Sequence, residues 1–272
     1  MTEFDFSTLT NTTQSAYNND VQNKRVWDAK QEAIGILERI AKQCPKARDF
    51  ECHRTLKIWL TGSSINGFGN KNSDADMCLV TDPGRKMTAR KSIIDFLHQM
   101  RRKLETERQY ITKNAEVIPA KVPILRVYLK TRGMEVQCDI NIDNTIGIRN
   151  SWLLRCYSEL DPRVRPFIYL VKKFAKSANI NDAQGGSLST YAWLLLSLHF
   201  LQCGVEEPVI PVVQQLTNED TGRIYGDNFH NDDLNDVAQI AMGIKQKINW
   251  QSKNTSSVGE LFYQWITYLE FS

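Results

Sequence analysis

The sequence of 272 residues contains no apolar run of the roughly 20 residues that a helix needs to cross a bilayer. Its longest apolar stretch, residues 191–201, is interrupted by Ser197 and His199 and predicts a buried helix instead. The N-terminus lacks both the basic segment and the apolar segment of a secretory signal peptide. We therefore expect a soluble cytoplasmic protein without a membrane partner.

Paired cysteines are missing as well. None of the six cysteines belongs to a C-x-x-C pair, so the sequence offers neither a zinc site nor a disulfide framework. The net charge of +3 is too small to indicate a nucleic-acid partner by itself. Hydrophobic residues make up 42% and charged residues 24%, as in ordinary globular proteins, and the length allows two modest domains.

The spacing of the apolar residues divides the chain into four segments. Residues 1–23 are rich in Thr, Asn, Gln and Ser, and we expect a loose N-terminal segment there. Residues 24–46 carry apolar residues at helical spacing and predict an amphipathic helix. Residues 47–145 combine strands of alternating polarity with one helix, which indicates an α+β domain. Residues 146–272 switch to a helical period and predict a helical domain.

Three carboxylates are placed on or beside predicted strands. Asp74 and Asp76 are two residues apart, so both project from the same face of an extended backbone. Asp139 lies on the polar side of an alternating strand at 134–142. If the two strands are neighbours, the three carboxylates converge and repel one another unless a cation lies among them. Such ligands suit Mg²⁺, with Mn²⁺ as the second choice. The alternative is that there is no metal site, that Asp74 ends a loop and that Asp139 is a solvent-facing strand residue.

The segment before Asp74 favours the metal site. Residues 62–73 hold three glycines and several small hydroxyl or amide residues, so backbone N–H groups can approach phosphate oxygens closely. Ser63 adds a hydroxyl donor. A Gly-Ser pair after a strand, an Asp-x-Asp pair shortly afterwards and a third Asp on a later strand form a much more specific combination than any one of them.

Further short motifs follow the acids, and these are Gly147-Ile-Arg-Asn150, Arg163-Val-Arg-Pro166, Val171-Lys-Lys-Phe174, Ile180-Asn181, Ser187-Leu-Ser-Thr-Tyr191 and Val258-Gly-Glu-Leu261. The Gly-Ser and Asp-x-Asp combination resembles the DNA-polymerase-β-like nucleotidyltransferase superfamily. With the later motifs, residues 25–271 resemble the non-canonical poly(A) polymerases and terminal uridylyltransferases. Within these, the chain looks most like the cytoplasmic poly(A) polymerases of the germline-development-defective type.

The resemblance implies a particular architecture. We expect an α+β catalytic domain of the polymerase-β-like nucleotidyltransferase type and a helical central (PAP-associated) domain, with the active site in the cleft between them. The helix at 24–46 is expected to pack on the helical domain. The family continues beyond the motif at 258–261 into a base-recognition loop, so we expect this chain to be truncated at its C-terminal end. The residues present therefore leave the choice between ATP and UTP open.

The resemblance also implies roles for the residues of the α+β domain. Asp74, Asp76 and Asp139 would bind the metal ions and catalyse nucleotide transfer. Asp139 would in addition favour attack by the RNA 3′-hydroxyl. Gly62 and Ser63 would hold the triphosphate of the nucleotide.

Five further nucleotide-binding residues are implied later in the chain. Asn150 would contact the ribose, and Thr190 would reach the phosphates. Lys172 and Lys176 would bind the triphosphate, and their spacing places both ammonium groups on one helix face. Tyr191 would stack on the base. Without the resemblance, solvated lysines and a core tyrosine are the alternatives.

The implied activity is template-independent addition of adenylates from ATP to RNA 3′ ends. In a two-metal mechanism the 3′-hydroxyl attacks the α-phosphate and pyrophosphate leaves. The alternatives are a terminal uridylyltransferase and a catalytically silent scaffold, and the intact set of three acids argues against the scaffold. The sequence has no RNA-recognition, KH or zinc-knuckle motif, so we expect an RNA-binding protein partner that supplies affinity for RNA.

Overall fold

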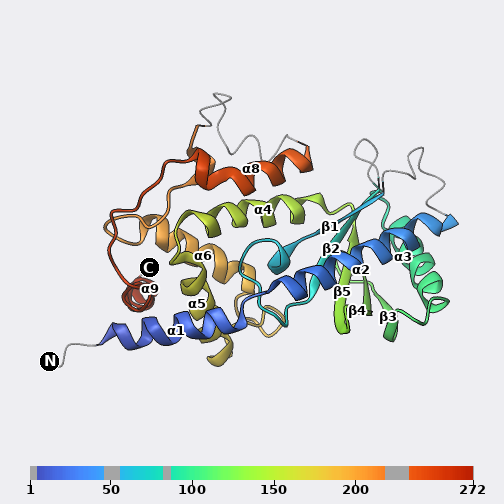
Figure 1. The fold of residues 1–272 in the computed structure, drawn as a ribbon, viewed down its shortest axis with the longest axis horizontal. Helices are drawn as coiled ribbons and strands as arrows, with labels where there is room; N and C mark the ends of the chain where they lie inside the picture. Colours follow the sequence, from blue (N-terminus) through green and yellow to red (C-terminus); the bar gives the residue numbers. More distant parts are fainter. Residues whose placement is uncertain (1–4, 46–55, 82–86, 218–232, 272) are drawn as a thin grey trace. The chain divides into compact units, whose positions relative to one another are not determined.

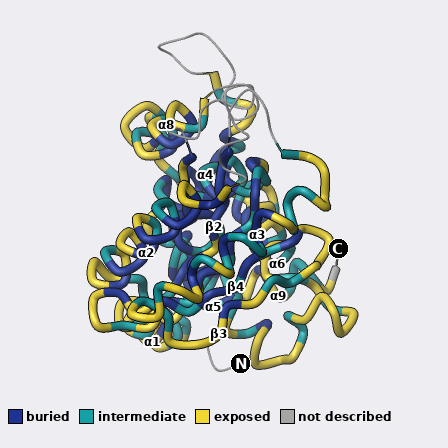
Figure 2. The backbone as a smooth tube through the Cα atoms, turned by 90° about the vertical axis from the view of Figure 1, so that its right-hand side faces the viewer, coloured by how far each residue is buried: buried dark blue, intermediate teal, exposed yellow. Residues whose placement is uncertain are grey.

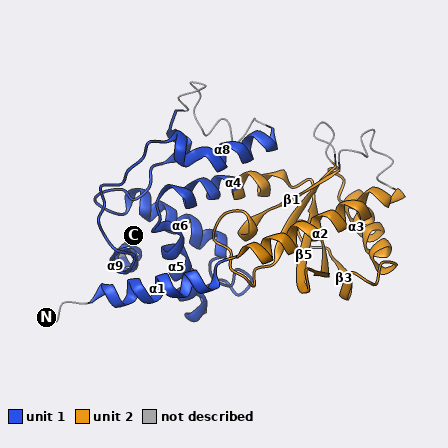
Figure 3. Cartoon of the chain, in the orientation of Figure 1, with its two compact units in different colours: residues 1–21, 152–272 blue, residues 22–151 orange. Residues whose placement is uncertain are grey.

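The computed structural model describes residues 5–45, 56–81, 87–217 and 233–271. The chain divides into two units, which Figure 3 shows in different colours. The sheet unit comprises residues 22–151, and the helical unit comprises residues 1–21 and 152–272. The division thus falls after Ser151 rather than after residue 145, because α4 (Thr145–Leu160) begins in the sheet unit and ends in the helical unit.

Five strands form one mixed sheet in the sheet unit (Figure 1). They are β1 (Lys57–Leu60), β2 (Ala75–Val80), β3 (Ile111–Ile118), β4 (Ile124–Thr131) and β5 (Met134–Ile142). Their order across the sheet is β1-β2-β5-β4-β3, with β2 and β5 parallel and the other neighbours antiparallel. The alternation predicted for 134–142 is observed, since Val136, Cys138 and Ile140 are buried and the residues between them are half-buried.

Two helices of the sheet unit contact the sheet and each other, and these are α2 (Lys24–Gln43) and α3 (Arg90–Glu105). Asn23 caps α2, because its side chain accepts the Val26 N–H at 3.0 Å. The prediction that this helix packs on the helical domain is wrong, since α2 contacts β1, β4 and β5. Small, fully buried residues such as Ala29 and Ala33 let the helix approach the strands closely and bury its apolar stripe there.

The remaining elements form the helical unit, and these are α1 (Phe6–Asp20), the second part of α4, α5 (Val164–Ser177), α6 (Thr190–Cys203), η4 (Val213–Gln215), α8 (Leu234–Lys247) and α9 (Val258–Phe271). The fully buried Trp265 is at the centre of an aromatic core. Its ring centroid lies 6.4 Å from that of Phe167, 6.1 Å from Phe174 and 5.7 Å from Trp193. Edge-to-face pairs of this kind add to the energy of apolar burial.

The expectation of a loose N-terminal segment is wrong for the residues of α1. Asp5 caps the helix by accepting the Ser7 N–H at 2.9 Å. The helix contacts α5 and α9, and the N–H of Gly259 donates to Oγ1 of Thr10 at 3.0 Å. A Cβ on Gly259 would lie 2.7 Å from the carbonyl oxygen of Phe6, so this approach requires glycine. Close packing and polar contacts therefore order a helix that stays largely exposed or half-buried (Figure 2).

In the parts of the chain that the structure describes, no helix has both the length and the apolar character needed to cross a bilayer. The described cysteines are free thiols, of which Cys44, Cys78, Cys138 and Cys156 are buried and Cys203 is exposed. Burial raises the pKa of the Cys138 thiol to about 12, as expected for a core residue. Cys52 lies outside the described residues.

Candidate functional site

The three aspartates lie on two neighbouring strands. Asp74 comes immediately before β2, Asp76 lies within β2 and Asp139 within β5. The two strands run parallel, and Asp76 is opposite Asp139 in their register. The strands are therefore neighbours, as convergence of the carboxylates requires, and the three side chains project from one face of the sheet.

The carboxylate of Asp139 is held by a cation of the protein. Arg126 is opposite Asp139 on β4 and donates from Nε to Oδ1 at 2.9 Å and from Nη2 to Oδ2 at 2.6 Å. This bidentate hydrogen bond raises the pKa of Arg126 above its usual value. Among the described residues, no three His, Cys, Asp or Glu side chains form a ready-made metal cage. The pairing with Arg126 fits this observation, because both oxygens of Asp139 are bonded to the guanidinium.

Asp74 and Asp76 are exposed carboxylates in an unfavourable electrostatic environment. Nearby protein atoms displace part of their water, and this partial burial, followed by the charge of Asp139, raises the pKa of both. The pKa of Asp76 reaches about 6, and the charge of Asp74 contributes to that shift. The amide of Gln137 donates from Nε2 to Oδ2 of Asp74 at 3.0 Å. The pair would gain from a cation, and its exposure lets one approach.

The turn before β2 packs directly against these aspartates. The turn η3 (Gly62–Ser64) starts at Gly62, whose φ of +58° is rarely adopted by L side chains. A Cβ on Gly62 would lie 2.6 Å from Oδ2 of Asp76, so only glycine fits. The Gly62 N–H donates to Oγ of Ser151 at 2.7 Å, and Ser63 is half-buried beside it. A phosphate oxygen that takes the Gly62 N–H therefore has to displace Ser151.

Asn150, the residue expected to contact the ribose, is half-buried on the part of α4 that belongs to the sheet unit. Its neighbour Ser151 donates from Oγ to the carbonyl oxygen of Gly147 at 2.6 Å and accepts the N–H of Gly62. One hydroxyl thus ties the Gly147–Asn150 motif to the phosphate-binding turn that the sequence predicts. The structure brings these two motifs together within one unit.

Lys30 is a buried cation under the same turn. Its side chain is on α2, and the residue is 1% exposed. The ammonium group donates to Oε1 of Gln22 at 2.9 Å, to Oγ of Ser64 at 2.8 Å and to the backbone carbonyl of Asp74 at 3.3 Å. Burial lowers the pKa of Lys30 to about 8, and the charge of Asp76 is the main opposing influence. The site therefore contains two cations of the protein, Arg126 and Lys30.

Our sequence reasoning missed both cations. Lys30 follows Val26 by four residues and precedes Ala33 by three, so it lies on the apolar stripe of the predicted helix. A lysine at such a position is a usable signal, because an ammonium on a buried face needs oxygen partners. Arg126 gives a weaker signal, since a charged residue on the polar side of a strand is usually solvated.

The other four candidates belong to the helical unit. Lys172 and Lys176 lie one turn apart on α5, with Lys172 half-buried and Lys176 exposed. Burial lowers the pKa of Lys172. Thr190 is the first residue of α6 and donates from Oγ1 to Oδ1 of Asn181 at 3.1 Å. Tyr191 is 45% exposed, so it is a surface residue rather than part of the core.

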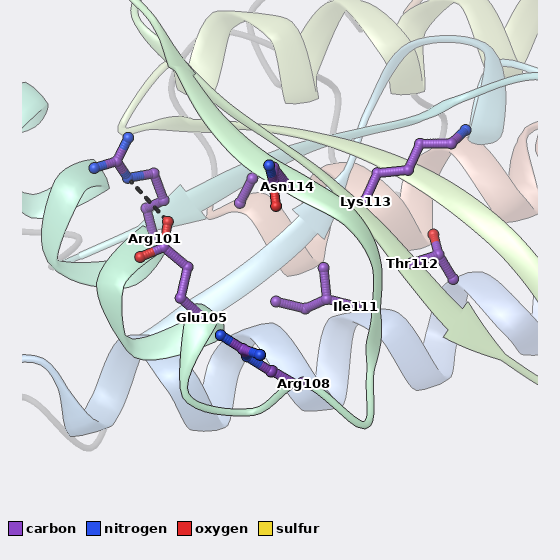
Figure 4. A pocket seen from close by; sticks show the side chains of 8 residues that line it. Arg101, Glu105, Arg108, Ile111, Thr112, Lys113 and Asn114 are labelled. Carbon is purple, nitrogen blue, oxygen red and sulfur yellow. Dashed lines mark ion pairs between the residues drawn. The ribbon is translucent and has the colours of Figure 1, made fainter.

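A pocket of about 610 Å³ on the sheet unit is lined by residues of α3, β3 and the turn between them (Figure 4). None of the predicted site residues lines it. Arg101 and Glu105 face each other across 3.6 Å, and Lys113 is paired with Glu135 at 2.6 Å. Because none of the three aspartates lines this pocket, we place the candidate site at the aspartates instead.

Comparisons with known proteins identify the family of the chain. Residues 9–159, more than half of the chain, match the family described as "Poly(A) RNA polymerase, mitochondrial-like, central palm domain". The chain is 39% identical over 230 residues to "Poly(A) RNA polymerase GLD2" of Danio rerio. That alignment covers 85% of this chain and 43% of the relative, so the chain spans less than half of the relative's length.

Two solved structures share the fold. "Structure of GLD-2/RNP-8 complex" superposes with a TM-score of 0.76 at 27% identity and covers 97% of this chain and 75% of that one. "Structure of the non canonical Poly(A) polymerase complex GLD-2 - GLD-3" has a TM-score of 0.76 at 28% identity and covers 96% and 75%. The α+β nucleotidyltransferase fold with helical additions is therefore confirmed. The chain belongs to the family of the poly(A) RNA polymerase, mitochondrial-like, central palm domain.

Proposed function

We propose that this chain adds adenylates from ATP to RNA 3′ ends without a template, as a cytoplasmic poly(A) polymerase. One observation carries the proposal: Asp76 and Asp139 lie opposite each other on parallel neighbouring strands, directly beside a turn in which Gly62 leaves no room for a side chain. That arrangement combines carboxylates for metal ions with a backbone turn for phosphates. The name of the Danio rerio relative favours ATP over UTP as the substrate.

The carboxylates fit a divalent metal ion. The oxygens of Asp74 and Asp76 are hard ligands, and their raised pKa values indicate that the protein alone does not stabilise both charges. We propose that these two residues hold Mg²⁺, or Mn²⁺ in its place, with Asp139 as a further ligand. When bound, such ions neutralise charge on the triphosphate and lower the pKa of the attacking hydroxyl.

The residues of the sheet unit then have separate tasks. Asp139 favours attack by the RNA 3′-hydroxyl, and Arg126 fixes the orientation of its carboxylate through two hydrogen bonds. Gly62 and Ser63 receive the phosphates, for which the N–H of Gly62 exchanges its bond to Ser151 for one to a phosphate oxygen. Positioning and charge stabilisation of this kind account for most of the rate of phosphoryl transfer.

The remaining candidates bind the nucleotide rather than react with it. We propose that Asn150 contacts the ribose and that Lys172 and Lys176 attract the triphosphate, with Thr190 as a further phosphate contact. Tyr191 is exposed enough for a base to stack on its ring, and every base has a face that can stack there. Lys176 adds affinity that falls as salt rises, because exposed charges are screened.

A second protein belongs to the proposal. Both structural neighbours are named as complexes, one with RNP-8 and one with GLD-3. We propose that this chain also works with a protein partner, and that the partner binds RNA and thereby raises its effective concentration near the site. A chain with a net charge of +3 has little attraction of its own for long RNA at physiological salt.

The test is extension of a labelled RNA oligonucleotide by the purified chain with each of the four nucleoside triphosphates separately. We expect tails with ATP and Mg²⁺, loss of the tails with a chelator, and longer tails when an RNA-binding partner tethers the oligonucleotide. Tails made with UTP alone would establish the uridylyltransferase instead. If no triphosphate extends a tethered oligonucleotide, the proposed activity is wrong and the scaffold alternative holds.

A further inference from the structure

Lys30 makes three bonds that join separate parts of the sheet unit. Gln22 precedes α2, Ser64 ends the turn that starts at Gly62, and the carbonyl of Asp74 immediately precedes β2. Its ammonium group therefore spans both ends of the segment from Gly62 to Asp74. The hydroxyl of Ser64 donates to the same Asp74 carbonyl at 3.2 Å, which closes a small ring of polar groups.

The bonds account for every donor of the buried group. An ammonium has three N–H donors, and the structure supplies three oxygen acceptors within 3.3 Å. None of the three is a carboxylate, so the contact is not an ion pair. A cation buried without a paired anion is usually costlier than an apolar side chain of the same size. Core filling alone therefore does not explain a lysine at this position.

The position of the Lys30 contacts, at the two ends of the Gly62–Asp74 segment, explains why a lysine is found there. The segment between the two bonded ends contains Gly62 and Ser63 at its start and leads into Asp74 and Asp76. Gly62 packs against the carboxylate of Asp76, so a shift of this segment moves the turn and the acids relative to each other. Movements of about 1 Å at such a site can lower a rate by about 100-fold.

We infer that Lys30 is a positioning residue for nucleotide addition: it clamps both ends of the Gly62–Asp74 segment and so fixes the phosphate-binding turn against the first metal-binding aspartate. This inference rests on the proposed function. Lys30 itself is only 1% exposed, so its side chain is shielded from a ligand that approaches from solvent. It acts through Ser64 and the Asp74 carbonyl, and its positive charge lies beside acids that repel one another.

The experiment compares Lys30→Met with Leu37→Ala, its matched control on the same helix. Leu37 is fully buried on α2, and its apolar side chain forms no hydrogen bond with Ser64 or Asp74. Its truncation therefore destabilises the helix without releasing the Gly62–Asp74 segment. Thermal melts, hydrogen–deuterium exchange of residues 61–74 and RNA extension well below Tm are measured for each variant. In Lys30→Met we expect faster exchange in this segment and a rate that is about 10- to 100-fold lower.

In Leu37→Ala we expect a lower Tm, with exchange of 61–74 and the rate per folded molecule unchanged. The double variant Lys30→Met with Ser64→Ala should be no slower than Lys30→Met alone, because both changes remove the same contact. If Lys30→Met does not fold, Ser64→Ala alone carries the test with the same two readouts.

Wild-type exchange and wild-type rate in a folded Lys30→Met protein would overturn the inference. An equal rate loss in Leu37→Ala would do the same, because it would make the effect one of general stability. If the wild-type chain extends no RNA, the proposed function fails, whereas the exchange of residues 61–74 still decides whether Lys30 holds the segment.

Discussion

The two units hold their candidate residues in different ways. In the sheet unit the acids are engaged by neighbours, since Arg126 binds both oxygens of Asp139 and Gln137 donates to Asp74. In the helical unit Tyr191 is 45% exposed and Lys176 is exposed on α5. The sheet unit therefore fixes its polar groups in advance, whereas the helical unit presents side chains that can adjust to a ligand.

The difference follows from the elements that carry the residues. Neighbouring strands in register fix the backbone positions of Asp76, Asp139 and Arg126 through the sheet itself. The surface of α5 places Lys172 and Lys176 on one face, and the long side chain of the exposed Lys176 can change rotamer there. Damage to the sheet unit should therefore reduce catalysis, and damage to the exposed residues of the helical unit should reduce binding.

The strongest test of this comparison is Asp76→Ala. We expect it to abolish nucleotide addition, because it removes the carboxylate that is opposite Asp139 and packs against Gly62. The fold should survive, and the metal-free protein should melt slightly higher, since the raised pKa of about 6 shows that folding disfavours this charge. Gel analysis of RNA extension and a thermal melt are the measurements.

The matched control is Asp28→Ala, which removes a half-buried carboxylate of α2 that is 3.8 Å from Lys24. Surface pairs of this kind contribute little, so activity and Tm should stay at wild-type values. Wild-type extension by Asp76→Ala would mean that the active site has been assigned to the wrong residues.

The next test compares two glycines with positive φ. Gly62 and Gly133 have φ values of +58° and +71°, but a Cβ on Gly62 meets Asp76 at 2.6 Å and one on Gly133 meets nothing within 4 Å. Each change to alanine should destabilise the fold by about 1–2 kcal/mol through backbone strain. Only Gly62→Ala should also slow nucleotide addition, by at least about 100-fold, because it displaces the carboxylate. Equal rates in the two variants would contradict the close-approach argument.

Arg126→Met tests whether Asp139 needs its partner. Removing the guanidinium leaves a carboxylate that is only 12% exposed without its two hydrogen bonds, and we expect the rate to fall about 10- to 100-fold. Arg126→Lys should recover part of the rate, because an ammonium keeps the charge but not the planar fork. In the control Arg132→Met, which removes an exposed ion pair with Glu32, the rate should not change. If Arg132→Met also slows nucleotide addition, the lower rate of Arg126→Met is due to the lost positive charge and not to a changed orientation of Asp139.

Much of the sheet unit was predictable from the sequence, because its signals are local. The period-two alternation of 134–142 gave the strand and the polar side of Asp139. The two-residue spacing predicts that Asp76 within β2 and Asp74 immediately before it project from the same side. Pairing of β2 with β5 is a tertiary contact, so the residue spacing left it as a condition for the three carboxylates to converge.

The predictions that failed concern features that depend on contacts between segments far apart in the sequence. The composition of residues 6–20 indicates disorder, yet α1 forms because α5 and α9 provide a surface and Gly259 lets the backbone approach. The pattern of α2 gave the helix but could not say which surface would cover its apolar stripe. Arg126 was missed because thirteen positions separate it from the partner on the next strand.

The smallest effect is expected in the helical unit, from Tyr191→Ala. A base that stacks on an aromatic ring contributes about 1–3 kcal/mol, and we expect a loss of ATP affinity at the lower end, because this residue is 45% exposed already. The maximal rate at saturating ATP should change little, since the ring takes no part in the transfer step. Leu195 lies one turn later on α6 with the same 45% exposure, so Leu195→Ala removes similar apolar surface without removing a stacking face. The measurements are titration calorimetry with ATP and rates at saturating ATP. Equal ATP affinities in the two variants would mean that Tyr191 does not stack on the base. A lower maximal rate with unchanged affinity would contradict the contrast between a sheet unit that reacts and a helical unit that binds.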